Sequence, residues 1–563
     1  MEIRFFYSLM GKFLIILLFL FQKSFSQTTY YHRYVIEFTD KNNSPYAIEE
    51  PSQYLSERAI ERRNRYDIPV LLNDLPVNPS YIQQVTVTGV KLLNRSKWLN
   101  SITIQTEDSL ALVVINNLPF VKTASPVAVR QARPSLIQKQ KLQEDELKTA
   151  EADFYDYGTA AHQIEMMNGN ILHDQGFHGE EMIIAIFDGG YYNCNPDSLD
   201  VFDSLFAEDR ILGMWDFVRQ NDSVFNYATH GTEVLSAIAA NTPGFQVGTA
   251  PKASVYLFIT EDVSSEYPIE EHNWAAAAEV ADSVGADIIS SSLGYSDFDD
   301  PAFNHTYADM DGKTTMCSRA AATAASKGMI VCSSAGNEGA KPWFYITAPA
   351  DADSIITVGA TDSTGTFTSF SSHGPTADGR IKPTIVAQGI RAWVIDPAGW
   401  HHTTFPGNGT SFSNPIAAGL VACLWQANQE KSNMQIIDAI AKSASLYFNP
   451  NDSFGYGITN FQLADLILKG EAPFDLNITK PVVYPNPFSD SFGILYYESS
   501  AQSIDVELFD MTGRKIIGFN HTLQAGYNFL PVESLEHAPN GSYLVRVQFS
   551  DHTDVVRVVK VSQ

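Results

Sequence analysis

The stretch Gly407–Pro415 reads GNGTSFSNP and opens an apolar, helix-like segment that continues to Asn428. Pro415 is tolerated only near the start of a helix, so we expect the helix to begin at about Ser411. A serine there lies where free backbone N–H groups and the helix dipole favour developing negative charge. Ser411 is therefore a candidate nucleophile, and the alternative is a plain serine cap.

Two shorter motifs precede this stretch. The apolar strand-like run 182–187 ends at Asp188, and functional groups of parallel α/β sheets lie at the carboxyl ends of strands. His230 stands in THGTEV (229–234), at the start of a helix of small residues, and imidazole is the usual general base near neutral pH. Taken alone, each residue is explained as well by a structural role.

A fourth motif, SAGNEG at 334–339, follows the apolar run 329–333. Asn337 at a strand end can direct its amide N–H toward an oxyanion, although a simple Asn-Glu-Gly turn would use the same residues. The candidates occur in the order Asp188, His230, Asn337 and Ser411. The order Asp, His, Ser is that of the subtilisin arrangement and differs from those of α/β-hydrolases and chymotrypsin. The four motifs together indicate serine nucleophilic catalysis.

The region 154–448 alternates between apolar strand-like runs and helical stretches. Continuous apolar strands joined by helices are typical of a parallel sheet covered on both faces, so the fold class is α/β. The expected strands are 182–187, 254–259, 287–291, 329–333 and 355–358, and the expected helices are 270–284, 314–326 and 411–428.

On these motifs, Tyr157–Phe448 resembles the subtilase family of serine peptidases. The likeness extends to GTAPKA at 248–253, GADIISSSLG at 285–294 and FSSHGP at 370–375. It implies a subtilisin-like fold and a secreted endopeptidase that acts on proteins or peptides through an acyl-enzyme, without a catalytic metal or required cofactor. The implied triad is Asp188, His230 and Ser411, with Asn337 in the oxyanion hole.

The same resemblance implies two facing walls of a substrate cleft: Ser292, Leu293 and Gly294 on one side, and Ser334, Ala335 and Gly336 on the other. The chain departs from the family at Gly189, because the family usually has Ser or Thr after the catalytic Asp. Two alternatives are an inactive subtilase fold used for binding and a serine esterase. The intact motifs argue against the first, and the motif order and cleft segments against the second.

The N-terminal segment 1–26 has the layout of a secretory signal peptide. Arg4 and Lys12 give a basic start, Phe13–Phe21 is an apolar run, and Ser24-Phe25-Ser26 is a small-x-small site. The run is too short for a membrane-spanning helix, which needs about 20 apolar residues. We therefore expect export and no transmembrane segment in the mature protein; the alternative is a buried strand or helix.

The block 27–129 reads as a small α+β unit, with strands expected at 33–39, 101–106 and 120–123 and helices at 52–65 and 108–117. It resembles subtilase propeptides, which implies a zymogen; the alternative is a retained N-terminal domain. The following connector, 130–153, is rich in Gln, Lys and Glu and has no aromatic residue. Such a composition suits an exposed linker that holds the maturation cut.

After a second expected linker, 449–474, the block 475–563 has short strands separated by Gly and Asn turns, typical of a small β-sandwich. Its YPNPF at 484–488 and its closing basic strand resemble the C-terminal sorting domain of bacterial type IX secretion. The resemblance implies passage through the periplasm with the secretion machinery as partner, then release or cell-surface attachment. The alternative is a generic β accessory domain.

The composition excludes several classes. Apolar residues make up 44% and charged residues 18%, which excludes a disordered chain. The 37 Lys and Arg against 64 Asp and Glu give a net charge of −27, which disfavours nucleic-acid or anionic-membrane partners. An acidic loop offers oxygen ligands for a structural calcium ion, but its spacing fits no template and suits a solvated loop. Its residues are Asp297, Asp299, Asp300, Asp309 and Asp311.

The four cysteines allow three full pairings in an exported protein. Cys332 and Cys423 lie in apolar runs and are expected to be core residues. A bridge between Cys194 and Cys317 is conceivable, and the sequence does not decide it.

Overall fold

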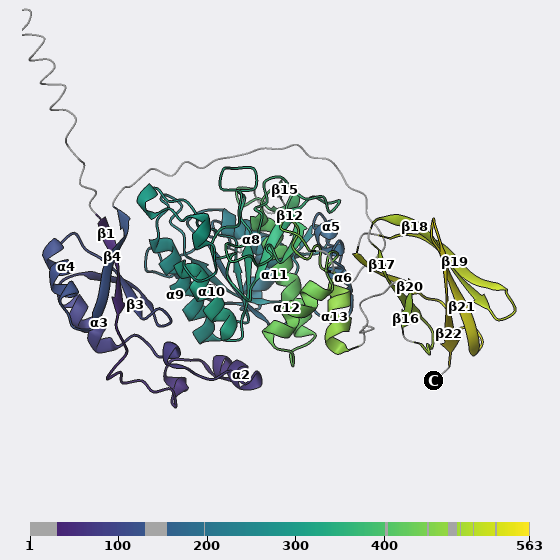
Figure 1. Cartoon of the computed structure of the whole chain (residues 1–563), viewed down its shortest axis with the longest axis horizontal. Coiled ribbons are helices and arrows are strands. Elements are labelled where there is room, and N and C mark those ends of the chain that lie inside the picture. The colour runs from purple at the N-terminus through teal and green to yellow at the C-terminus, as the bar shows by residue number, and fades with distance from the viewer. Residues whose placement is uncertain are drawn as a thin grey trace, which may run out of the picture.

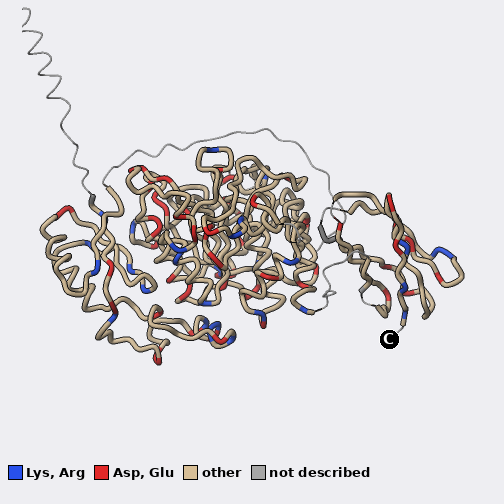
Figure 2. Tube along the Cα trace, in the orientation of Figure 1, with Lys and Arg blue, Asp and Glu red and all other residues tan. Residues whose placement is uncertain are grey.

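The computed structural model describes residues 31–129, 155–195, 198–399, 403–447, 450–470, 481–484, 486–498, 500–523 and 526–561. In chain order these form an N-terminal α+β domain, a central α/β domain and a C-terminal β domain (Figure 1). Aspartate and glutamate positions occur in all three (Figure 2). The expected signal segment, 1–26, and the connector 130–153 lie outside the described residues.

The central domain is built on seven strands that all run parallel, in the order β13-β12-β11-β10-β5-β9-β6. All five strands expected from the apolar runs are present. The strands are β5 (Ile183–Asp188), β6 (Ile211–Asp216), β9 (Ser254–Ile259), β10 (Ile288–Ser291), β11 (Ile330–Ser334), β12 (Ile356–Thr361) and β13 (Ile385–Gln388). Two antiparallel pairs lie outside this sheet: β7 (Asn241–Thr242) with β8 (Gln246–Val247), and β14 (Ala392–Ile395) with β15 (Thr404–Gly407).

Helices cover both faces of this sheet. Along β5, Ile184 and Ile186 pack into one core with α8 (His230–Ala239) and α11 (Thr410–Gln426). Ala185 and Phe187 pack into a second core with α9 (Ile269–Val284) and α10 (Met316–Ser326). The alternation follows from the two-residue period of a strand and confirms the expected double covering. The helices are α5 (Ala161–Glu165), α6 (Gly169–Asp174), α7 (Asp203–Ala207), α8 (His230–Ala239), α9 (Ile269–Val284), α10 (Met316–Ser326), α11 (Thr410–Gln426), α12 (Asn433–Lys442) and α13 (Phe461–Lys469), with short 3-10 turns η3 (Asp200–Phe202), η4 (Pro301–Phe303) and η5 (Tyr307–Asp309).

The prediction of a linker at 449–474 is wrong over much of its length, because this segment contains α13. Asn460 caps this helix by accepting a hydrogen bond from Leu463 N at 2.9 Å. Phe461 and Ala464 are fully buried in the same core as α11 and α12. One apolar face over nine residues is enough to dock the helix, so the central domain continues to Gly470.

The N-terminal domain has an antiparallel sheet in the order β2-β3-β1-β4. The helix expected over 52–65 begins only at Glu57, because Ser56 Oγ accepts from Ala59 N and caps it there. The elements are β1 (Tyr31–Phe38), β2 (Lys91–Ser96), β3 (Ser101–Gln105), β4 (Val121–Val129), α2 (Glu57–Arg65), α3 (Pro79–Thr86), α4 (Ser109–Asn116), η1 (Pro51–Gln53) and η2 (Leu72–Asp74).

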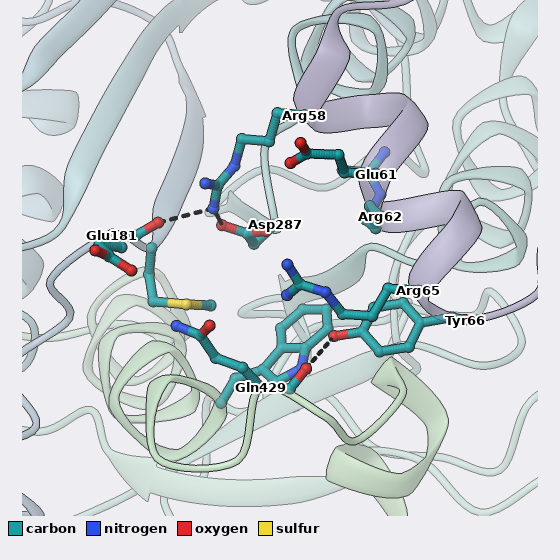
Figure 3. A pocket seen from close by; sticks show the side chains of 10 residues that line it. Arg58, Glu61, Arg62, Arg65, Tyr66, Glu181, Asp287 and Gln429 are labelled. Carbon is teal, nitrogen blue, oxygen red and sulfur yellow. Dashed lines mark hydrogen bonds and ion pairs between the residues drawn. The ribbon is translucent and has the colours of Figure 1, made fainter.

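Helix α2 lies against the central domain rather than on its own sheet (Figure 1). Arg62 and Arg63 form ion pairs of 2.7 and 2.9 Å with Asp282 of α9, and all three side chains are at most 4% exposed. Beside them is a small cavity of about 90 Å³ (Figure 3), where Tyr66 donates to the Gln429 carbonyl at 2.8 Å. The N-terminal domain is thus anchored to the central domain through a buried charge network.

The C-terminal domain is the expected β-sandwich. Two antiparallel sheets, β16-β17-β20 and β19-β18-β21-β22, enclose one apolar core. The YPNPF motif joins its first and last strands, because Asn486 Oδ1 accepts from Val559 N at 2.9 Å and Phe488 N donates to Val559 O at 2.9 Å. The strands are β16 (Val482–Tyr484), β17 (Phe492–Glu498), β18 (Gln502–Asp510), β19 (Lys515–Leu523), β20 (Gly526–Val532), β21 (Gly541–Gln548) and β22 (Thr553–Lys560).

All four cysteines are free and fully buried, so a bridge between Cys194 and Cys317 is not formed. Cys332 and Cys423 are core residues, as expected. Among the described residues, no helix combines the length and the apolar character needed to cross a bilayer.

Candidate active site

Asp188 is the last residue of β5 and is only 1% exposed. Its Oδ1 accepts from Gly189 N at 2.7 Å, and its Oδ2 lies 2.8 Å from His230 Nδ1. Both carboxylate oxygens therefore have hydrogen-bond partners, and Nδ1 is the imidazole nitrogen that bonds to the aspartate.

His230 is the first residue of α8, and the next residue must be small. Gly231 N donates to Gly190 O at 3.0 Å, which brings the helix start against the loop after β5. A Cβ at Gly231 would lie 2.4 Å from Gly190 O and 3.0 Å from Asp188 Cβ. The glycine of the THGTEV motif is therefore explained by the close approach that places His230 on Asp188.

The environment of His230 acts on its pKa in two directions. Burial lowers the pKa, but the charge of Asp188 and the hydrogen bond to it outweigh this effect and raise the pKa to about 9. The protonated imidazole is thus stabilised. A general base needs this stabilisation because it carries a proton during part of the reaction.

Ser411 lies in the first turn of α11, which begins at Thr410, one residue earlier than expected. Ser411 Oγ donates to the Ser292 carbonyl at 3.4 Å, and Ser292 Oγ donates to the Ser411 carbonyl at 2.9 Å. The next residue is Phe412, and the centroid of its ring lies 5.9 Å from the centroid of the His230 ring. Packing of α8 against α11 therefore brings the serine to the side of the sheet where His230 lies.

Asn337 follows β11 and faces the start of α11. Its Oδ1 accepts from Thr410 N at 2.9 Å and from Thr410 Oγ1 at 3.0 Å. These two donors fix the amide, so the Nδ2 group points away from Thr410 and is left to donate elsewhere. The structure thus pairs Asp188 with His230, places Asn337 against the residue before Ser411, and packs the residue after Ser411 beside His230.

The two expected wall segments are joined by residues 347–348. Tyr295 and Ala348 exchange two backbone hydrogen bonds of 2.8 and 3.1 Å, and Thr347 N donates to Ala335 O at 3.3 Å. Ser334 and Ala335 are buried, whereas Gly294 is exposed and Leu293 and Gly336 are half-buried. Thr347 belongs to no sequence motif, and only the fold reveals its position between the walls.

The unusual Gly189 also has a structural reason. A Cβ at this position would lie 2.6 Å from Val263 Cγ1. Val263 belongs to the loop after β9, which approaches the β5 loop closely here. The missing side chain therefore makes room for Val263 and leaves the contacts of Asp188 intact.

The acidic loop over 297–311 does not gather its carboxylates into one site. Asp300, Asp309 and Asp311 accept hydrogen bonds from nearby backbone N–H groups and stabilise turns. A tighter group stands elsewhere: Glu261, Glu266 and Glu270 offer oxygens within 4.8 Å of one another. Burial, with the charge of Asp299, raises the pKa of Glu266 to about 7. A structural calcium ion stays a prediction.

Comparison with known proteins adds three matches. Residues 179–457 match the Subtilase family, residues 33–146 the Peptidase S8 propeptide domain of Bacteroidota, and residues 482–561 the secretion system C-terminal sorting domain. The central domain belongs to the subtilase family. The protein is therefore a subtilisin-like serine endopeptidase with a propeptide and a secretion sorting domain, as the motifs indicated.

Individual relatives of this subtilase are distant. Subtilisin E of Bacillus subtilis (strain 168) is 28% identical over 327 residues, which are 57% of this chain and 74% of the relative. Serine protease AprX of the same organism is 28% identical over 317 residues, 52% of this chain and 67% of the relative. The crystal structure of MycP1 from the ESX-1 type VII secretion system is 21% identical, with a TM-score of 0.42, and the match covers 58% of this chain and 90% of that one.

Proposed function

We propose that this subtilase is exported and hydrolyses internal peptide bonds of proteins through Asp188, His230 and Ser411. The observation that carries the proposal is the 2.8 Å contact between His230 Nδ1 and the buried Asp188, beside the helix that bears Ser411. A binding module has no use for such a pair, so the geometry favours catalysis over an inactive fold.

In the proposed reaction, Ser411 Oγ attacks the peptide carbonyl carbon and His230 Nε2 takes the hydroxyl proton. His230 then delivers that proton to the departing amine as the C–N bond breaks, which leaves an acyl-enzyme. A water molecule attacks the ester in the same way, with His230 again as base, and restores Ser411. Asp188 keeps Nδ1 protonated throughout and stabilises the imidazolium.

The tetrahedral oxyanion needs donors placed before it forms. Asn337 Nδ2 and the Ser411 backbone N–H are the proposed donors. The first is oriented by the two bonds that Asn337 Oδ1 accepts from Thr410, and the second is one of the free N–H groups in the first turn of α11. No step calls for a metal ion.

We further propose that the chain is a latent precursor. Val127–Val129 of the propeptide pack against Tyr267 and Ile269 at the start of α9, so the chain enters the connector 130–153 from the surface of the catalytic domain. A cut in that connector would start maturation. The proposed parts are a signal peptide (1–26), a propeptide (27–129), the catalytic domain (154–470) and a sorting domain (475–563), which the secretion machinery would bring through the periplasm to the surface or the medium.

The test compares purified mature enzyme with the Ser411→Ala variant, using casein and a fluorophosphonate probe. We expect wild type to be labelled and to cleave casein, and the variant to do neither. Absence of both activities in wild type would contradict the peptidase proposal and favour a binding role. Labelling and ester hydrolysis without casein cleavage would favour an esterase.

A further inference from the structure

The first turn of helix α11 lacks one of the hydrogen bonds of a regular helix. Each carbonyl of an α-helix accepts from the N–H four residues later, and residue 415 is a proline, which has no N–H. The carbonyl of Ser411 therefore has no helical donor at that position. Ser292 supplies a donor instead, because its Oγ lies 2.9 Å from the Ser411 carbonyl oxygen. The backbone of the proposed nucleophile is thus bonded to the segment that follows β10.

Asn414 makes a second connection between α11 and β10. Its side chain is fully buried, and its Nδ2 donates to the Ser291 carbonyl at 3.2 Å and to Ser290 Oγ at 3.3 Å. The Ser291 carbonyl can only accept a hydrogen bond, which fixes the direction of the amide. Residues three apart lie on one face of a helix, so Ser411 and Asn414 contact the end of β10 from the same side.

The end of β10 is held firmly enough to support these contacts. The strand lies between β5 and β11 and is hydrogen-bonded to both. On the opposite face of the sheet, the fully buried Trp274 donates from its Nε1 to Ser291 Oγ at 2.9 Å. Asp188 ends β5, the strand next to β10. The contact of Asn414 with β10 therefore connects the helix of Ser411 to the strand beside that of Asp188.

The amide of Asn414 is not fully satisfied at this position. Its Oδ1 is buried and has no hydrogen-bond partner among the described residues. Buried polar atoms are usually paired, so an unpaired one needs an explanation. An apolar side chain would fill the same space without leaving an unpaired oxygen. The two bonds that Nδ2 donates, rather than packing, therefore explain why an amide stands here.

We propose that Asn414 is a positioning residue for the proposed reaction: its Nδ2 holds the first turn of α11 on the end of β10 and so directs Ser411 Oγ toward His230. This role rests on the proposed function, because the placement of Ser411 affects a reaction rate only if Ser411 is the nucleophile. A misplacement of a reacting group by about 1 Å can lower a rate on the order of 10²-fold.

The test measures the rate constant with which mature wild type and Asn414→Ala react with a fluorophosphonate, and also kcat and KM on one peptide. The labelling rate constant describes only molecules that react, so a misfolded fraction lowers the final yield and not the rate constant. We expect Asn414→Ala to lower the labelling rate constant and the kcat per labelled site by about 10–10²-fold, with little change in KM. The pH midpoint should stay at the wild-type value, because the contact between His230 and Asp188 is kept.

Asn433→Ala is the matched control. Asn433 is 4% exposed, and its Nδ2 also donates to two acceptors, the carbonyls of Ala325 at 2.8 Å and Met329 at 2.9 Å. It lies at the start of α12, and Met329 precedes β11, whereas Asn337 follows that strand. Loss of this amide should therefore lower Tm and leave the labelling rate constant unchanged.

Ser290→Ala is a second variant, which removes one of the two acceptors of Asn414 Nδ2. It should slow labelling in the same direction as Asn414→Ala, but by less. A wild-type rate constant in Asn414→Ala, or equal slowing in Asn433→Ala, would overturn the proposed role. If Asn414→Ala yields no folded protein, an unchanged rate constant in Ser290→Ala overturns it. A wild type that neither reacts with the probe nor cleaves casein would instead overturn the proposed function itself.

Discussion

His230 Nδ1 lies 2.8 Å from Asp188 Oδ2, and the two side chains differ sharply in exposure: 36% for the histidine and 1% for the aspartate. The carboxylate is thus fixed inside the domain while the imidazole reaches the surface where substrate arrives in the proposed reaction. Because the negative charge is buried and directed at the ring, it stabilises the protonated imidazole, and we expect it to set the pH range of activity.

We expect kcat/KM to rise with pH between 7 and 10. The reaction needs neutral His230, and Asp188 raises the pKa of His230 to about 9 against the opposing effect of burial. The neutral fraction therefore grows as pH increases through that value. Asp188→Asn removes the charge, so the midpoint should fall toward the ordinary value of about 6.5, and kcat should drop on the order of 10⁴-fold. A pH–rate profile measures both; a wild-type midpoint near 6.5 would refute the role given to Asp188.

Asn337→Asp should lower kcat by about 10²–10³-fold with little change in KM. The substitution keeps the oxygen that accepts from Thr410 N at 2.9 Å but removes the Nδ2 donor. Asn337→Ala loses the donor and both bonds from Thr410, so it should show the same loss of kcat and also a lower Tm. Kinetics and thermal unfolding of the two variants separate stabilisation of the oxyanion from support of the loop. Normal kcat in Asn337→Asp would exclude the donor role.

The positions of the candidate catalytic residues on their strands and helices could be predicted from sequence because local motifs encode their backbone geometry. Residue 231 must be a glycine because α8 closely approaches the loop after β5, and Pro415 restricts where α11 begins. Each motif therefore has a local structural cause. The strand 254–259 was predicted to the residue for a similar reason, since an apolar run flanked by polar residues has clear ends.

The features that sequence missed depend on distant partners. Thr347 lies between Gly294 and Gly336 only because the fold brings these distant segments together. Arg62 and Arg63 look like a solvated helix face, and only their pairing with Asp282, more than 200 residues away, explains their burial. Helix α13 was missed because its one apolar face is short and follows a polar segment, which resembles a linker.

Arg62→Ala should loosen the propeptide from the catalytic domain. Arg62 is 4% exposed at its side chain and pairs with the fully buried Asp282 at 2.7 Å. Asp282 keeps Arg63 and Lys97 as partners, so the loss should be smaller than the cost of about 3–5 kcal/mol that is typical of a buried charge left without any partner. We expect a Tm lower by several degrees in the full-length Ser411→Ala precursor, measured by thermal unfolding.

Arg58→Ala is the matched control for that prediction. Arg58 lies on the same helix and pairs with Asp287 at 2.6 Å, but its side chain is 40% exposed. Exposed pairs contribute about 0–1 kcal/mol, so its Tm should change by less than that of Arg62→Ala. Equal decreases in Tm for the two variants would show that burial of the charge network does not hold α2 against the central domain.

Asn486→Ala should weaken the sorting domain where its first and last strands meet. Asn486 Oδ1 accepts from Val559 N at 2.9 Å, and its Nδ2 donates to the Arg557 carbonyl at 3.1 Å. Two lost hydrogen bonds cost about 1–3 kcal/mol. Because the side chain links the first strand to the last, its loss should loosen β22 and let trypsin reach the backbone at Arg557, whose side chain is already exposed. Limited proteolysis of the full-length Ser411→Ala chain measures this, with the exposed Asn520→Ala as control. If Asn520→Ala is cut as fast as Asn486→Ala, the YPNPF motif does not hold the last strand, and its role must be sought in contacts with the secretion machinery.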